Sequence, residues 1–285
     1  MSRPAHAIAV AVVLSLAAMV SVQSGVSLSL PVIREYGVLS TSSLRLCWAA
    51  AVLALIVRPP LHRYTRAQWR AALVLGAGMS VMTLCFFMAI ERLPQYLAVA
   101  LEFCGPLAVA VVGVRGVLAL AWPLLAAAGI GLLVWGDAHG GGGVSPLGVV
   151  LALFAAAGWA TYIVMMKRVG IVFQGLQGLS VSLLVAAVLT LPLAVAEVGA
   201  LRFPADQIVW TAGLAVLVPL VPYVLEITAL RYLTAAAFGV LLSLEPAIGA
   251  LSGWIILGQA MTGAQILGTL LVVCASIGVV RQGAG

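Results

Sequence analysis

Apolar runs of about 18 or more residues recur along the whole chain, and each can cross a hydrocarbon core of about 30 Å as a helix. The chain is 64% hydrophobic and only 8% charged, whereas about 25% of an average soluble domain is charged. A water-soluble surface cannot be built from that composition. The sequence therefore predicts an all-α integral membrane protein that crosses the bilayer many times.

Turn residues and charges divide the chain into ten candidate transmembrane helices. They are expected near residues 7–30, 38–57, 69–90, 94–115, 117–135, 146–167, 174–196, 207–230, 234–257 and 262–280. The first run is long for a signal peptide, so we expect it to be the first span. A linker at 137–145, which contains four consecutive glycines, separates two expected five-helix halves, 1–136 and 146–285.

Basic residues gather in one set of expected loops. With the N-terminus in the cytoplasm, ten of the fourteen basic residues face inward: Arg3, Arg58, Arg63, Arg66, Arg70, Arg115, Lys167, Arg168, Arg231 and Arg281. The outer loops hold Arg34, Arg92 and Arg202 together with Glu35, Glu91, Asp137, Glu197 and Asp206. This asymmetry follows the positive-inside rule, so both termini should be cytoplasmic. The net charge of +6 then records orientation and indicates no nucleic-acid partner.

Cysteine and histidine usage gives no sign of metal or redox chemistry. The four cysteines are scattered singly through apolar runs, and the three histidines fall in loops or at a terminus. The sequence also lacks the HExxH and GxSxG motifs of hydrolytic enzymes. We expect no metal, no cofactor and no enzymatic activity.

The two halves share a weak internal repeat. An offset of 140 residues aligns Ala89 with Ala229, Leu93 with Leu233, Leu101 with Leu241 and Pro106 with Pro246. A unit of five helices reverses its direction in the membrane at each copy, which predicts an inverted repeat around a pseudo-two-fold axis. Such a duplication is typical of two-half carriers, although packing alone could also retain it.

Pro106 and Pro246 are expected to break their helices at equivalent positions. A proline inside a helix frees the carbonyl four residues earlier, here those of Glu102 and Leu242. At membrane depth a freed carbonyl is tolerated only where protein, water or a ligand meets it. Each helix also carries a carboxylate beside its break, Glu102 in one and Glu245 in the other.

Charged side chains at mid-membrane are the leading candidates for a transport site. A charge there costs about 2.5–3.5 kcal/mol on insertion scales, so it usually faces a cavity or a partner. Glu245 lies near mid-membrane with no basic residue at its depth. It could be a functional carboxylate, or a structural carboxyl that stays protonated and neutral. Arg45 and Glu102 lie at similar depth, so they could form an ion pair, or Arg45 could bind a substrate carboxylate.

Weaker candidates are polar, aromatic and methionine side chains on the expected inner faces. They are Gln23, Ser24, Met82, Thr83, Phe86, Trp159, Thr161, Tyr162, Tyr223 and Glu226. For any one of them, packing or an interfacial position is an alternative explanation. Glu226 in particular could anchor its helix at the membrane surface.

Five stretches carry a resemblance to a known family. They are "SVQSGVSLS" (21–29), "LRLCWAA" (44–50), "LAVALEFCGPLAVAV" (97–111), "VPYVLEITALRYL" (221–233) and "FGVLLSLEPAIGALSGWIILGQ" (238–259). The chain resembles the EamA-type amino-acid exporters of the drug/metabolite transporter superfamily, in particular the threonine/homoserine exporters. The resemblance implies ten helices in two inverted repeats and weight on Arg45, Glu102, Pro106, Glu226, Glu245 and Pro246. Cys104 stands where threonine is expected, which leaves the substrate open.

The sequence thus predicts an exporter of amino acids in the bacterial inner membrane, working by alternating access around a mid-membrane cavity. Its expected substrates are amino acids as small molecules, either threonine/homoserine-like or aromatic and neutral ones. Membrane lipid is a further expected partner, protons are a candidate, and the protein is expected to be a monomer or a weak homodimer. A lipid or drug carrier of the same fold is the alternative. A structural scaffold without transport would be a third possibility.

Overall fold

A computed structural model describes residues 5–112, 118–139, 143–199, 203–230, 232 and 241–283. Within these ranges every regular element is a helix, which confirms the all-α prediction. Five of the described helices are long and apolar enough to cross a membrane: 9–36, 38–57, 66–90, 146–172 and 177–198. The spans expected at 94–115 and 207–230 are each divided into shorter helices.

The helices follow the expected spans closely, and most of them extend further than predicted. Those of the first half are α1 (Ala5–Tyr36), α2 (Val38–Val57), α3 (Arg66–Ile90), α4 (Gln95–Glu102), α5 (Cys104–Val112) and α6 (Leu118–His139), with a short 3-10 helix, η1 (Leu61–Arg63). Those of the second half are α7 (Pro146–Val172), α8 (Gln177–Val198), α9 (Ala205–Ala215), η2 (Val216–Leu220), α10 (Val221–Leu230), α12 (Glu245–Leu257) and α13 (Gly263–Gly283). Because α6 continues to His139, the first residues of the expected 137–145 linker are helical.

The span expected at 94–115 is interrupted at Phe103, between α4 and α5. Pro106 lies three residues further on and supplies no backbone N–H to the carbonyl of Glu102. The span expected at 234–257 has a turn at Ser243 and Leu244, directly before α12. Phe103 and Ser243 are themselves 140 residues apart, so the two interruptions obey the offset of the repeat.

The continuous helix expected at 207–230 was wrong. The structure has α9, the π-helical segment η2 and α10 in its place, and Val218 adopts an extended backbone conformation (φ −147°, ψ 110°) inside η2. Pro219 follows directly, and a proline disfavours a helical conformation in the residue before it. The break therefore has a local cause in the Val218–Pro219 sequence.

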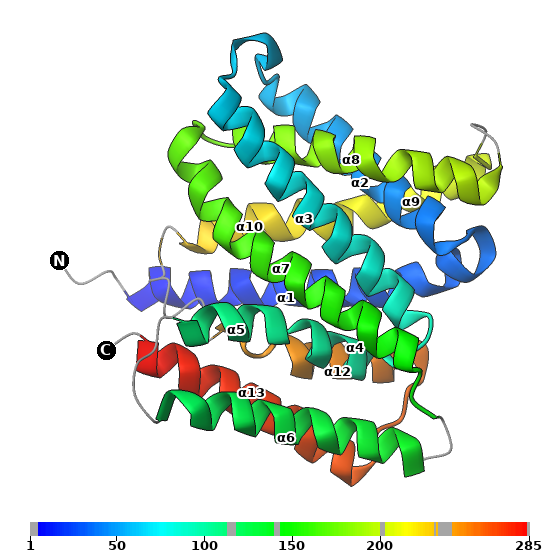
Figure 1. Cartoon of the computed structure of the whole chain (residues 1–285), viewed down its shortest axis with the longest axis vertical. Helices are drawn as coiled ribbons and strands as arrows, with labels where there is room; N and C mark the ends of the chain where they lie inside the picture. The colour runs from blue at the N-terminus through cyan, green and yellow to red at the C-terminus, as the bar shows by residue number, and fades with distance from the viewer. Residues whose placement is uncertain are drawn as a thin grey trace.

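The main helix contacts join a helix of one half to a helix of the other. The first helix of each half, α1 or α7, packs against the third helix of the other half, α10 or α3 respectively. α2 packs against α8, and α6 lies antiparallel beside α13 (Figure 1). This pairing is what a pseudo-two-fold relation between the halves would produce. The N-terminus and the C-terminus lie on the same side of the bundle (Figure 1).

Glycines permit the closest helix contacts. A Cβ on Gly129 of α6 would lie 2.6 Å from the carbonyl oxygen of Gly268 in α13, and a Cβ on Gly268 would lie 2.6 Å from that of Gly129. Gly105 at the start of α5 is tighter still, since its Cβ would be 2.1 Å from the Ala156 carbonyl oxygen of α7. Small residues at such crossings are typical of membrane helices, which gain little from the hydrophobic effect between themselves.

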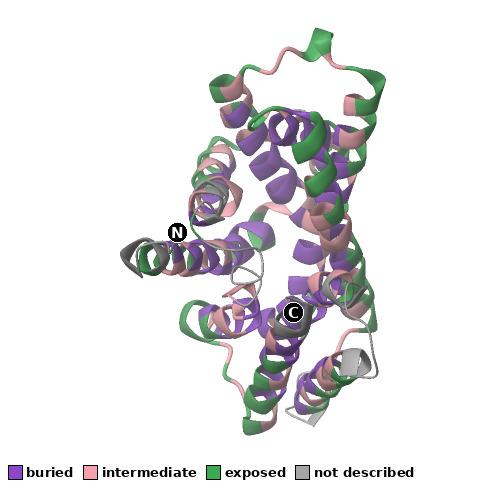
Figure 2. Cartoon of the chain, turned by 90° about the vertical axis from the view of Figure 1, so that its left-hand side faces the viewer, coloured by how far each residue is buried: buried purple, intermediate pink, exposed green. Residues whose placement is uncertain are grey.

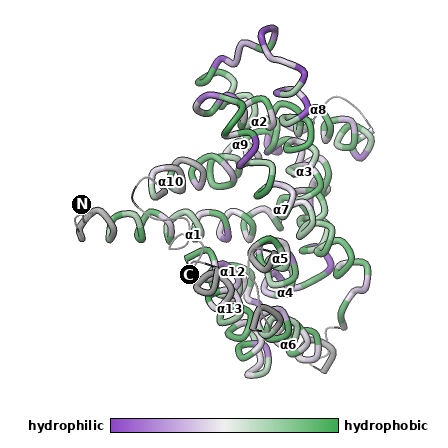
Figure 3. Tube along the Cα trace, turned by 60° about the vertical axis from the view of Figure 1, so that its left-hand side comes forward, coloured by the Kyte–Doolittle hydropathy of each residue, from purple (hydrophilic) through white to green (hydrophobic). Residues whose placement is uncertain are grey.

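The outward surface is apolar, as a membrane protein requires. Figure 2 places buried residues on the faces that the helices turn toward one another and exposed residues on the outside. Figure 3 shows hydrophobic residues along most of the helical trace, with hydrophilic residues at the loop between α2 and α3. Large exposed apolar side chains include Leu55, Ile171, Val188, Val209 and Ile255.

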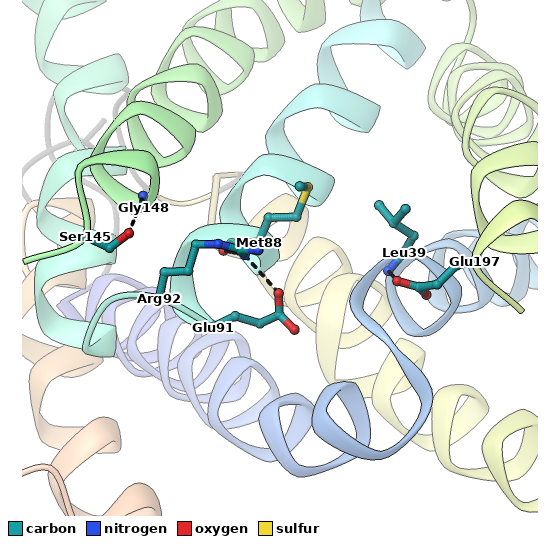
Figure 4. A network of polar contacts seen from close by, with 7 residues as sticks. All are labelled: Leu39, Met88, Glu91, Arg92, Ser145, Gly148 and Glu197. Atoms are coloured by element: carbon teal, nitrogen blue, oxygen red, sulfur yellow. Dashed lines mark hydrogen bonds and ion pairs between the residues drawn. The ribbon is translucent and has the colours of Figure 1, made fainter.

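Polar contacts fix the ends of the helices on the side away from the termini (Figure 4). Glu197 at the end of α8 accepts hydrogen bonds from the backbone N–H groups of Leu39 (3.2 Å) and Ser40 (2.7 Å), and so caps the start of α2. Arg92 pairs with Glu91 at 3.0 Å after α3. Ser145 caps α7 by accepting from the N–H of Gly148 at 3.2 Å.

A comparison of two glycines on α6 tests the packing of α6 against α13. Gly129→Ala should destabilise the protein by about 1–3 kcal/mol, because the new methyl group meets the Gly268 backbone. Gly131→Ala is the matched control, since a Cβ there has no atom within 4 Å. The measurement is the apparent melting temperature of the purified proteins in detergent. Equal melting temperatures for the two variants would contradict the close crossing.

Candidate functional site

A cavity of about 160 Å³ lies in the middle of the bundle, between the two halves. A single water needs about 10–15 Å³ on the same measure, so the cavity has room for a small solute. Its walls come from α1, α2, α3 and α4 of the first half and from α7, η2, α10 and α12 of the second. It is therefore a shared site that neither half forms alone.

Most of the residues proposed from the sequence line this cavity. They are Gln23, Arg45, Met82, Thr83, Phe86, Glu102, Trp159, Tyr162 and Glu245. Ser24 and Thr161 are not among the lining residues; the Thr161 hydroxyl donates to the Ala157 carbonyl, and its methyl group faces Gly78 of α3. Tyr223 and Glu226 lie on α10, but their side chains are outside the described part of the structure.

Glu102 and Glu245 bring two carboxyl groups to one cavity. Glu102 ends α4 and is 9% exposed, and Glu245 begins α12 and is 6% exposed. Each stands beside the interruption of its own helix, at Phe103 or at Ser243 and Leu244. The broken helices therefore direct acidic groups and backbone ends toward the same space, as in carriers built from discontinuous helices.

Arg45 faces the cavity from α2 and is 3% exposed. Its Nη1 donates to the Ser29 hydroxyl at 2.8 Å, and its guanidinium lies 4.1 Å from the centroid of the Phe87 ring. Its Nε is buried and has no hydrogen-bond partner. Among the described residues the ion pair found is Arg92–Glu91, so Arg45 and Glu102 do not form the ion pair that the sequence left open. A buried guanidinium held by neutral groups can still accept an anionic partner.

Apolar and aromatic side chains complete the walls. Trp159 of α7 lies edge-on to Phe103, with 5.7 Å between the ring centroids. Met79 and Met82 of α3 line the same space. A few charged groups set in an apolar wall are typical of a site that orients a small ligand.

A buried glutamine next to the cavity joins two helices and the segment after α12, and it was not predicted from the sequence. The Gln95 side chain, at the start of α4, accepts from the Ser27 hydroxyl at 2.7 Å and donates to the Gln23 carbonyl and to Gln23 Oε1, both at 3.2 Å. The Gln95 backbone N–H donates to Gln259 Oε1, beyond the end of α12, at 2.9 Å. Gln95 therefore ties α4 to α1 and to the segment that follows α12.

Several other lining residues were also missed, among them Val218, Pro219 and Pro222. They lie on the broken segment around η2, which brings Val218 so close to α1 that a Cβ on Gly25 would be 2.5 Å from its Cγ2. The two prolines, three residues apart, were the available signal. Among the described residues, no group of three or more histidine, cysteine or acidic side chains could hold a metal ion.

Comparison with known proteins places these observations in a family. The model of the EamA-like transporter family matches residues 146–281. The threonine/homoserine exporter RhtA of Salmonella typhimurium is 36% identical over 92% of this chain and 88% of its own length. The RhtA of Escherichia coli K12 is 34% identical over 94% of this chain and 90% of its own. A solved crystal structure matches 94% of this chain and 95% of its own with a TM-score of 0.63 and 18% identity, which supports the fold.

Replacement of Gln95 tests the side-chain hydrogen bonds that join α4 to α1, since the backbone N–H that binds Gln259 is unchanged. Gln95→Leu should cost about 1–3 kcal/mol of stability, because buried partners on Gln23 and Ser27 lose their hydrogen bonds. Gln174→Leu, at an exposed glutamine, is the control and should change little. Both effects are read from melting temperatures in detergent, and an unchanged Gln95→Leu protein would show that the junction is energetically unimportant.

Proposed function

The chain belongs to the EamA-like transporter family, and from that premise we propose that it exports small amino acids from the bacterial cytoplasm. It is a membrane transporter and not an enzyme. The observation that carries the proposal is one cavity of about 160 Å³ that holds a buried arginine and two buried carboxyl groups. This charge pattern is complementary to a zwitterion.

Each end of an amino acid has a matching group. The α-carboxylate is proposed to bind Arg45, whose unsatisfied Nε and planar fork suit a carboxylate. The ammonium group is proposed to bind Glu245 and Glu102. Trp159, Met79 and Met82 would contact the side chain of the substrate. We propose threonine and homoserine as substrates because the similar RhtA proteins are threonine/homoserine exporters.

We propose that the two halves rock about this cavity to expose it to either side in turn. Support comes from the pairing of α1 with α10 and of α3 with α7, the pattern expected if the cavity lies on a pseudo-two-fold axis between the halves. In such a motion the hydrogen bond from the Gln95 backbone N–H to Gln259, which joins the first half to the second, would be one contact that must break and reform. The positive-inside rule supports a cytoplasmic position for both termini, since the basic α2–α3 loop and the basic last turns of α7 lie toward their side of the bundle (Figure 1).

Substitution of Glu245 tests the proposed site directly. In proteoliposomes, Glu245→Gln should lower the rate of radiolabelled threonine and homoserine exchange at least about tenfold, the effect of losing about 1.4 kcal/mol of binding. Glu91→Gln is the matched control, because Glu91 is exposed and pairs with Arg92 away from the cavity. Equal exchange by both variants would remove Glu245 from the mechanism.

A separate competition experiment tests which class of substrate the protein transports. A panel of unlabelled amino acids should compete with threonine exchange, and a hydrophobic fluorescent cation should not. Competition by the cation alone would favour a lipid or drug carrier. Absence of any substrate-dependent flux in the wild-type protein would support a scaffold and reject transport.

We also propose that protons are the coupling ion and that Glu245 carries them. A carboxyl inside an alternating cavity can take a proton on one side and release it on the other. An imposed pH gradient should therefore drive threonine accumulation by the wild-type protein, and Glu245→Gln should lose this response. Equal wild-type flux with and without the gradient would indicate facilitated diffusion instead.

A further inference from the structure

A groove on the outward face of the bundle runs between α3 and α7, close to the side of the termini. Its apolar lining includes Ala71 and Val74 of α3 and Ile171 and Val172 of α7. Ile171 is 77% exposed and Val74 is 47% exposed, so these side chains face the surroundings rather than the core. In a membrane they would contact acyl chains.

Two arginines from different helices also line this groove. Arg70 is the fifth residue of α3, and Arg168 is four residues before the end of α7, so both lie about one turn from the same end of the helix pair. Both are exposed, and neither takes part in an ion pair within the described residues. Their guanidinium groups are therefore available to an external anion.

The surroundings of the two arginines are uniformly basic. Residues 58–70 and 165–172 contain Arg58, Arg63, Arg66, Arg70, Lys167 and Arg168, and no aspartate or glutamate. The exposed acids Glu91, Glu197 and Asp206 lie at the opposite end of the bundle. Since neither these two stretches nor the described lining of the groove contains an acidic residue, no carboxylate within them competes for the arginines.

Direct contacts between the elements hold this end of the groove in place. Gln68 Nε2 of α3 donates to the Val172 carbonyl of α7 at 2.8 Å. Tyr64, just before α3, lies edge-on to Phe173 with 5.0 Å between centroids and to Trp69 with 6.4 Å. The arginines are thus displayed on a fixed frame whose aromatic rings suit a membrane interface.

We propose that this groove binds an anionic phospholipid, with its phosphate between Arg70 and Arg168 and an acyl chain along the apolar lining. Arginine forks match phosphate oxygens, and basic pockets between transmembrane helices suit anionic head groups. The apolar lining selects a lipid over a soluble anion, and the two unpaired cations select an anionic lipid over a zwitterionic one.

The lipid would link the two halves of the protein. α3 belongs to the first half and α7 to the second, and on their inner side the same helices carry Met82 and Trp159 of the cavity. A phosphate held by both arginines would stabilise the contact between α3 and α7 without entering the cavity. Whether the cavity transports amino acids does not affect this binding.

Lipid-dependent thermal stability of the full-length protein in a neutral detergent tests the proposal. Phosphatidylglycerol should raise the melting temperature of the wild-type protein by several degrees more than phosphatidylcholine does. In the Arg70→Gln/Arg168→Gln variant, the concentration for half of this shift should rise roughly 30-fold, as expected for about 1 kcal/mol lost per arginine. Arg58→Gln/Arg63→Gln, which removes the same charge from the same end, should leave the shift nearly unchanged.

Three outcomes would overturn the proposal. The first is an equal phosphatidylglycerol shift in the Arg70/Arg168 variant, and the second is an equal loss in the Arg58/Arg63 control, which would indicate diffuse electrostatic attraction. The third is the same shift with inorganic phosphate alone, which would indicate a soluble anion. Native mass spectrometry of the wild-type protein is independent of variant folding: retained phosphatidylglycerol should exceed retained phosphatidylcholine several-fold, and equal retention would also reject the site.

Discussion

Three ionisable side chains buried inside an apolar bundle are the constraint on which the rest of the structure depends. Arg45, Glu102 and Glu245 cannot be left in lipid at low cost, so the helices that carry them must enclose a polar space. The structure meets this requirement by breaking two helices at repeat-related positions and by lining one cavity from both halves. Arg45 is the clearest case, because a serine hydroxyl and an aromatic ring hold it instead of a carboxylate.

Much of this architecture could be predicted from sequence because its causes are local. The membrane spans follow from runs of apolar residues, and the interruptions near Phe103 and Ser243 follow from the prolines that come after them. The cavity residues on α3 and α7 were found because polar and aromatic side chains are rare in such helices. The break at Val218 was overlooked, although Pro219 and Pro222 mark it, because the surrounding run is otherwise uniformly apolar.

Other features could not be predicted because they depend on contacts between distant segments. Gln95 looks like an ordinary residue after a proline, and only the fold brings it to Gln23 and Gln259. The ion pair considered for Arg45 and Glu102 relied on equal depth in the membrane, but two side chains at one depth can line the same cavity without coming within ion-pair distance of each other. Ser24 and Thr161 stand next to true lining residues and differ from them by one step of helical rotation.

The reciprocal glycine contact between α6 and α13 has a consequence for how variation would be tolerated. A side chain added at Gly129 would meet the Gly268 backbone, and one added at Gly268 would meet the Gly129 backbone. A bulkier residue at either position therefore has no space into which it can relax. α6 and α13 pack against α4, α5 and α12. Among the described residues, those that line the cavity come from neither α6 nor α13. Substitutions at the Gly129–Gly268 contact would therefore appear as low yields of assembled protein, whereas the molecules that did assemble would keep normal turnover.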